Sequence, residues 1–77
     1  MKSTEVYIPM TSIEARDAML KRLPVVSGGI TYSRISAIIY RPDDNGNVKI
    51  FVELLDKNEH SVTITYPKDV TLSDRTN

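Results

Sequence analysis

Residues 34–66 read RISAIIYRPDDNGNVKIFVELLDKNEHSVTITY, and this stretch decides the fold. It is rich in Ile, Val and Thr, which favour strands, and polar turn-forming residues interrupt it twice. With the residues just before it, the stretch predicts three consecutive β-strands, at about residues 31–41, 48–55 and 61–66. Strands joined by such short turns pair as hairpins. The stretch therefore predicts an antiparallel meander.

The first turn contains Asn45-Gly46, a strong signal for a type I′ turn, because both central residues of that turn need positive φ. A two-residue loop at this point places Ile39 opposite Val52. Residues directly opposite each other share one face of a sheet.

The second turn, at residues 56–60, allows two registers. A two-residue loop places Val62 opposite the charged Glu53, whereas a three-residue loop with a bulge places Val62 opposite Leu54. Because a slip of one residue moves every side chain to the other face, the apolar match favours the second register. Glu59 then occupies the bulge position that glycine usually holds, with mild strain.

This register gives the sheet a core face and a second face. The predicted core face carries Ile35, Ala37, Ile39, Val48, Ile50, Val52, Leu54, Val62, Ile64 and Tyr66. The second face carries four large apolar side chains, Ile38, Tyr40, Phe51 and Leu55, although a sheet face in solvent is mostly polar. Three explanations stay open: another segment of the chain covers this face, it forms a homodimer interface, or it binds another macromolecule.

The segments on either side of the meander predict a helix and short connecting elements. Thr11 and Glu14 have the spacing of a capping box, and Pro24 is expected to end the helix. The predicted apolar side of this helix, which would cover the core face, consists of Ile13, Ala15, Met19, Leu20 and Leu23. Residues 25–29 are expected to form a connector with a tight bend, and residues 67–72 a single turn followed by a short strand. Residues 5–8 predict an edge strand ended by Pro9.

The predicted fold class is therefore α+β, with an N-terminal helix packed on a three- to five-stranded antiparallel meander. The same order of elements is also that of small SH3-like and Sm-like β-barrels with an N-terminal helix, which is the alternative. That resemblance concerns architecture and implies no function by itself.

The composition limits the size and the kind of site. The chain has 77 residues, ten Lys and Arg, ten Asp and Glu, a net charge of zero and no cysteine. We expect one small domain at residues 1–72 and a polar, disordered tail at residues 73–77. Such a domain needs almost all its apolar residues for a core, which leaves little for an enclosed active site. Lacking cysteine, a signal-peptide pattern and a membrane-spanning run, the chain is expected to be cytoplasmic.

Four basic residues are candidate contacts for an anion or a nucleic acid: Arg16, Arg34, Arg41 and Lys49. Arg16 falls within the apolar side of the helix, where it either lays its stem along the sheet or anchors a carboxylate or phosphate. The other three lie near the first hairpin among aromatic residues, a combination that suits single-stranded nucleic acid. However, a net charge of zero lacks the electrostatic footprint of nucleic-acid binding.

No residue pattern predicts catalysis or a cofactor. The only histidine, His60, has no second ligand at a recognised spacing. An EF-hand loop with Gly46 at its sixth position would need ligands at Arg41 and Val52, so calcium is not expected. The sequence predicts no catalytic residue, no metal and no cofactor.

Several segments resemble short proteins of Gram-positive anaerobes that have no assigned function and whose genes often lie near mobile-element genes. They are residues 23–29 (LPVVSGG), 34–41 (RISAIIYR), 52–58 (VELLDKN), 61–64 (SVTI) and 67–70 (PKDV). The similarity covers roughly residues 20–72, and in those proteins Gly stands where this chain has Glu59. The resemblance implies no activity, and it favours an accessory or regulatory protein of a bacterial mobile element.

The leading functional hypothesis is a non-enzymatic protein-interaction or self-association module whose second sheet face meets a partner or a second copy. The alternative is an SH3/Sm-like protein that binds single-stranded nucleic acid.

Overall fold

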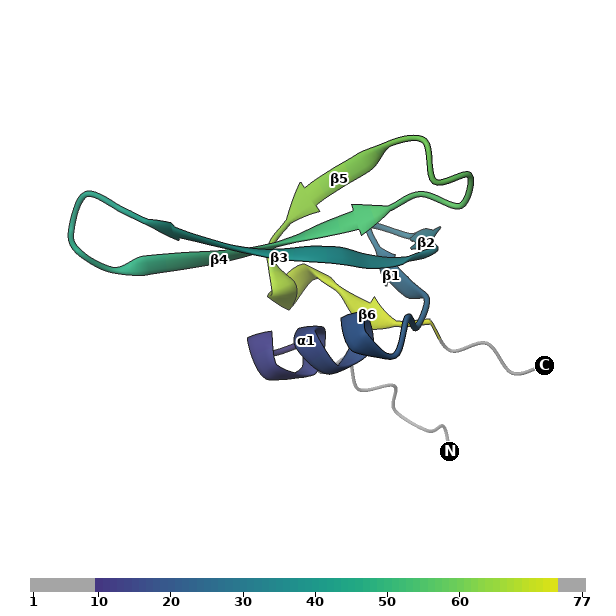
Figure 1. Ribbon diagram of the computed structural model, residues 1–77, viewed down its shortest axis with the longest axis horizontal. Coiled ribbons are helices and arrows are strands. Elements are labelled where there is room, and N and C mark those ends of the chain that lie inside the picture. The colour runs from purple at the N-terminus through teal and green to yellow at the C-terminus, as the bar shows by residue number, and fades with distance from the viewer. Residues whose placement is uncertain (1–9, 74–77) are drawn as a thin grey trace, which may run out of the picture.

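The computed structural model of this chain describes residues 10–73. A helix, α1 (Ser12–Leu20), precedes six strands and one turn of 3₁₀ helix (Figure 1). The strands and the turn are β1 (Val25–Ser27), β2 (Ile30–Tyr32), β3 (Arg34–Pro42), β4 (Val48–Leu55), β5 (Val62–Thr65), η1 (Pro67–Asp69) and β6 (Thr71–Leu72).

The strands form two antiparallel sheets, with strand orders β2-β1-β6 and β3-β4-β5. This confirms the α+β class with an N-terminal helix on antiparallel strands; the described strands do not close into a barrel. The edge strand predicted at residues 5–8 lies outside the described residues, as do residues 74–77. Ser73, which we assigned to the tail, donates its N–H to the carbonyl of Pro24 at 3.0 Å.

The ends of α1 are fixed by local hydrogen bonds. The predicted capping box is confirmed: the Glu14 N–H donates to the Thr11 hydroxyl at 3.1 Å, and the Thr11 N–H donates to the Glu14 carboxylate at 2.9 Å. At the other end, Arg22 has a φ of 57° and the Leu23 N–H donates to the carbonyl of Ala18. This pattern is a Schellman motif, which ends the helix before Pro24.

The helix buries a narrower stripe than its sequence predicts. Ala15 and Ala18 are fully buried, whereas Ile13 is 79% exposed and Leu20 is 64% exposed. The predicted apolar side is therefore wrong at Ile13 and Leu20. Alanine has almost no side chain beyond the backbone, so this stripe lets α1 lie close to β3, which it contacts.

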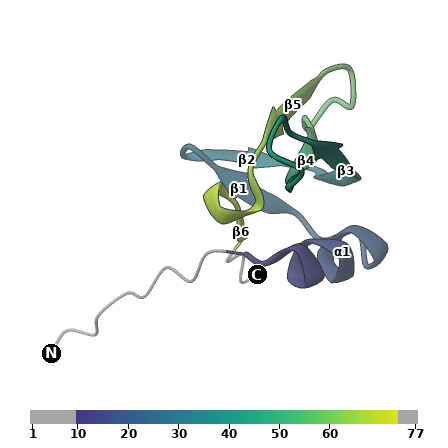
Figure 2. The same cartoon turned by 90° about the vertical axis from the view of Figure 1, so that its left-hand side faces the viewer.

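The core lies between α1 and the two sheets (Figure 2). Its largest fully buried side chains are Val25, Ile35, Val52, Leu54 and Val70, which come from both sheets and from the residue just before β6. The core is thus assembled from segments far apart in the sequence.

Residues 25–29 form a strand and a turn instead of the predicted connector. Val25 pairs with Tyr32 in the β1–β2 hairpin and with Leu72 of β6. Gly28 and Gly29 both have positive φ, at 60° and 77°, as a two-residue type I′ loop requires. The bend at the glycines is confirmed, but the strand before it was missed.

The β3–β4 loop is one residue longer than predicted. The Asp43 N–H donates to the Asn47 carbonyl at 2.7 Å, and Gly46 adopts a φ of 85°. One oxygen of the Asp43 carboxylate accepts the N–H groups of Asn45 and Asn47 at 2.8 and 3.0 Å. These bonds fix a three-residue loop, a type I turn followed by a left-handed glycine.

The longer loop shifts the β3–β4 register by one residue. Ile39 lies opposite Phe51 and not opposite Val52, which pairs with Ile38. A bulge between Ile35 and Ala37 shifts the pairing once more. The predicted pairing of Ile39 with Val52 is therefore wrong, because the Asp43 side chain starts the loop one residue earlier than a type I′ turn would.

The β4–β5 register is also shifted by one residue. The Asp56 N–H donates to the Ser61 carbonyl at 3.1 Å, which closes a four-residue loop and places Val62 opposite Leu55, not opposite Leu54. Glu59 has a φ of 60°, which confirms that it occupies a left-handed position where glycine is usual.

The two shifts turn β5, and β3 from Ala37 onward, over relative to β4, whereas Ile35 stays on the core face opposite Leu54. Three residues predicted for the core, Val62, Ile64 and Tyr66, are consequently 40% to 49% exposed. Val48 is 57% exposed for another reason: the β3–β4 hairpin projects beyond α1 (Figure 1), which leaves its tip exposed on both faces.

Candidate interaction surface

The face of the β3-β4-β5 sheet that points away from α1 is apolar. Buried Val52 and Leu54 point toward the core, so the alternating residues of β4 point the other way. Residues opposite these, and Tyr66 just after β5, share the same face. We call this surface the outer face; its large apolar side chains are Ile39, Phe51, Leu55, Val62, Ile64 and Tyr66.

An aromatic pair lies within the outer face. The rings of Phe51 and Tyr66 are stacked, with centroids 4.9 Å apart and planes inclined by 28°. Val62, Ile64 and Tyr66 remain 49%, 45% and 40% exposed. Tyr66 continues the alternation of β5 and lies beside Phe51, so the apolar surface is continuous from β4 to β5.

Three of the charged groups that flank this apolar surface are paired within the chain. The guanidinium of Arg41 lies 5.6 Å from the centroid of the Phe51 ring, and the ammonium of Lys68 lies 5.5 Å from that of Tyr66. Arg34 donates to the Glu59 carboxylate at 3.0 Å. An apolar centre with a polar rim is the usual anatomy of a protein interface.

A single polar contact interrupts the apolar surface. The Ser36 hydroxyl donates to the Glu53 carboxylate at 2.7 Å, and both side chains are partly buried. Ser36 is the extra residue of the β3 bulge, so the bulge supplies the partner that Glu53 needs.

The β5 strand adds an unpaired edge to this surface. Among the described residues β5 pairs only with β4, and Val62, Thr63 and Ile64 are exposed. Val62–Thr65 contains no charge and no proline, the two devices that most often protect an edge strand. The edge and the outer face thus leave β5 open on two sides.

The four residues of the predicted interaction face lie on two different faces of the sheet. Phe51 and Leu55 do lie on the outer face, but Tyr40 pairs with Ile50 and Ile38 pairs with Val52, which places both on the face toward α1. Their assignment to one face with Phe51 is wrong because the β3 register is shifted. Ile38 packs against the core, and Tyr40 is 61% exposed on the projecting hairpin.

The sequence prediction missed Ile39, Val62, Ile64 and Tyr66 as surface residues. A signal for the first hairpin was present: Asp at the first and Gly at the fourth position of a turn favour type I. Asp43 and Gly46 have this spacing and indicate the three-residue loop. Asp56 is an equivalent starting residue for the second loop.

The second loop is held by the Asp56 carboxylate. Its oxygens accept the Ser61 hydroxyl at 2.8 Å and the His60 N–H at 2.9 Å. The Ser61 hydroxyl, and then the His60 N–H, lower the pKa of Asp56 below its usual value, because they stabilise the carboxylate form.

The four basic candidate residues do not converge. Arg41 and Lys49 lie directly opposite each other, but Arg34 lies at the other end of β3, where it is paired with Glu59. Arg16 is exposed on α1, which packs against the opposite side of the sheet from the outer face. These residues therefore do not form one basic patch.

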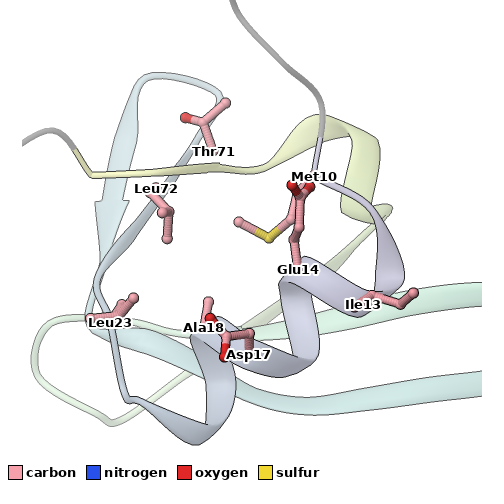
Figure 3. Close-up of a pocket in the computed structure, with 8 residues that line it drawn as sticks. All are labelled: Met10, Ile13, Glu14, Asp17, Ala18, Leu23, Thr71 and Leu72. Atoms are coloured by element: carbon pink, nitrogen blue, oxygen red, sulfur yellow. The ribbon is translucent and has the colours of Figure 1, made fainter.

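A second concave surface lies between α1 and β6 (Figure 3). This α1–β6 groove has a volume of about 630 Å³, and its apolar lining residues are Met10, Ile13, Ala18, Leu23 and Leu72. Glu14 and Asp17 also line it, but both are engaged, Glu14 in the capping box and Asp17 with Lys21 at 3.2 Å. The groove is thus an apolar channel with no free charge pointing to a polar ligand.

Within residues 10–73, no three His, Asp or Glu side chains lie close enough together to hold a metal ion. No helix in this part of the chain is long and apolar enough to cross a membrane.

The β6 strand returns after η1 to pair with β1. The two sheets stay separate, so the described strands do not form the SH3-like or Sm-like barrel that was the alternative prediction. Comparisons of the chain with protein-family models, curated proteins and solved structures gave no match.

Proposed function

We propose that this chain is a non-enzymatic self-association module, in which the outer faces of two copies pack against each other. The observation that carries the proposal is the row of exposed apolar side chains on β5 and just after it, Val62, Ile64 and Tyr66, beside Phe51. Contiguous apolar surfaces of this kind usually serve interaction. Two such sheets stack about 10 Å apart, with their facing side chains forming a shared core.

A second copy suits this face better than a charged partner does. The chain has no net charge, so two copies do not repel each other. The cations at the rim, Arg41 and Lys68, lie over the aromatic rings, and Arg34 is neutralised by Glu59. A symmetric pair also buries the same apolar residues on both copies at once.

The size of the face predicts a weak dimer. Three strands about 4.8 Å apart and about five residues long give a flat footprint on the order of 250 Å². A standard stable interface buries roughly 800 Å² of accessible surface per partner. Even with the relief of the side chains, the face is small, so we expect reversible dimers that form in the micromolar range or above.

The test is sedimentation velocity over concentrations from about 1 μM to about 1 mM, where weak dimers become populated. The wild type is expected to shift toward dimer mass, and Ile64→Glu to remain a monomer. Tyr40→Glu is the matched control, because Tyr40 is also exposed and apolar but faces the α1 side. Phe51→Glu should act like Ile64→Glu. A wild type that stays monomeric throughout, or equal loss of dimer in Tyr40→Glu, would contradict the proposal.

A second candidate function, binding of single-stranded nucleic acid, is favoured by one observation. Stacked Phe51 and Tyr66, with Arg41 and Lys68 over their rings, resemble a platform on which bases stack. The zero net charge and the scattered basic residues weigh against it. Salt-dependent binding of a labelled oligonucleotide, lost in Arg41→Ala/Lys68→Ala, would support it, and absence of binding at low salt would exclude it.

The cellular setting is also part of this proposal. The cysteine-free composition suits a reducing cytoplasm. The resemblance of residues 20–72 to proteins encoded near mobile elements suits an accessory or regulatory role there.

A further inference from the structure

The α1–β6 groove has the form of a site for an extended strand. Among the described residues β6 pairs only with β1, so the edge of β6 away from β1 has backbone groups without a strand partner. The groove provides apolar contacts next to this edge, from Ala18 on the helix and Leu72 on the strand (Figure 3). A peptide added to a sheet edge gains hydrogen bonds from the edge and specificity from the adjoining pockets.

The first described residue, Met10, belongs to this groove. It is a lining residue, it is only 6% exposed, and nine residues precede it in the sequence. A segment tethered directly to a site has an effective concentration in the millimolar range, so even a weak contact is populated.

We propose that residues 5–8 of this chain bind in the α1–β6 groove as an extended strand beside β6. These residues, Glu-Val-Tyr-Ile, are rich in strand-forming types, and Pro9 follows them, as suits an edge strand. The sheet order becomes residues 5–8, β6, β1 and β2. This inference does not depend on self-association through the outer face.

The length and direction of residues 5–8 fit the groove between α1 and β6. Both α1 and β6 run toward the end of the groove where Leu72 pairs with Val25, just after the helix. A segment that ends at Met10, beside the start of α1, therefore runs antiparallel to both. From Glu5 to Ile8 a strand spans about 10 Å, and about seven helical residues span the same length.

The position of Met10 also separates this site from the outer face. Met10 belongs to the core cluster with Ala15 and Ala18, on the α1 side of the β3-β4-β5 sheet. To reach the outer face, the segment would have to pass around a sheet edge, whereas Met10 itself lines the groove.

The absence of cysteine makes disulfide trapping in the full chain a direct test. Leu72→Cys is combined in turn with Glu5→Cys, Val6→Cys, Tyr7→Cys and Ile8→Cys, so that the series covers all four residues of the segment. A disulfide needs Cα atoms within about 7 Å. We expect at least one pair to oxidise within the same chain, seen as loss of free thiols at monomer mass under non-reducing conditions.

Ile64→Cys on the outer face, combined with the same four substitutions, is the matched control and should stay reduced. Trapping to residue 64, a cross-link only between two chains, or no cross-link with residue 72 would each overturn the proposal. Methyl NOEs in the wild type between Val6 and Ala18 or Leu72 give a measurement that needs no substitution; they are expected, and their absence counts equally against it.

Discussion

Substituting Glu59 separates two opposing energies in the β4–β5 loop. Its φ of 60° is a left-handed conformation that costs a non-glycine residue roughly 1–2 kcal/mol. Its carboxylate also accepts a hydrogen bond from Arg34 at 3.0 Å. Since these two side chains are 50% and 28% exposed, solvent weakens the ion pair, which contributes about 0–1 kcal/mol.

Glu59→Gly and Glu59→Ala both remove the ion pair, but only glycine relieves the backbone strain. Glycine also gives the unfolded chain more freedom, which costs about 0.4–1 kcal/mol. We therefore expect Glu59→Gly to be more stable than Glu59→Ala by about 1 kcal/mol and to lie close to the wild type.

The assay is urea unfolding followed by circular dichroism, at one low protein concentration so that any dimer contributes equally. In thermal unfolding, about 1 kcal/mol corresponds to a shift in Tm of about 4–8 °C for a domain of this size. Arg34→Ala measures the ion pair from its other side. If the alanine variant matches or exceeds the glycine variant, positive φ at Glu59 does not strain the loop and the reasoning fails.

Two further predictions concern the helix end and the acid sensitivity of the fold. Arg22 ends α1 with a φ of 57°, so Arg22→Gly should be about 1 kcal/mol more stable than Arg22→Ala in the same urea assay; equal stabilities would contradict this. Folding lowers the pKa of Asp56, so the Asp56 carboxylate stabilises the folded state at pH values above the unfolded pKa of about 4. This stabilisation is lost as the pH falls through the folded pKa. Ser61→Ala should make the urea midpoint less sensitive to pH between about pH 5 and pH 2, and an unchanged pH profile would refute the role of this bond.

The positions of the elements follow from local signals. The capping box at Thr11 and Glu14 starts the helix, and β4 occupies the residues that the alternating pattern predicts. The single turn and short strand after residue 66 are confirmed as η1 and β6. Each depends on residues within a few positions of one another, and one sequence is sufficient to identify them.

The sheet faces depend on a finer detail. One extra residue in each loop reverses which side of a strand points to the core. An error of one residue in each predicted turn therefore placed Ile38 and Tyr40 on the surface where the structure has Ile39 and Ile64. Apolar matching did not reveal the error, because β3 carries apolar residues on both faces.

The sequence by itself determined the α+β class, the start of the helix, the locations of the β3–β4 and β4–β5 hairpins and the strained site at Glu59, since each rests on local conformational preference. Only the tertiary structure decided that Ala15 and Ala18, and not Ile13 and Leu20, face the core. It alone decided that Val25 pairs with Leu72 and leaves a groove beside α1. These outcomes depend on packing between segments nearly fifty residues apart, whose energies no local pattern contains.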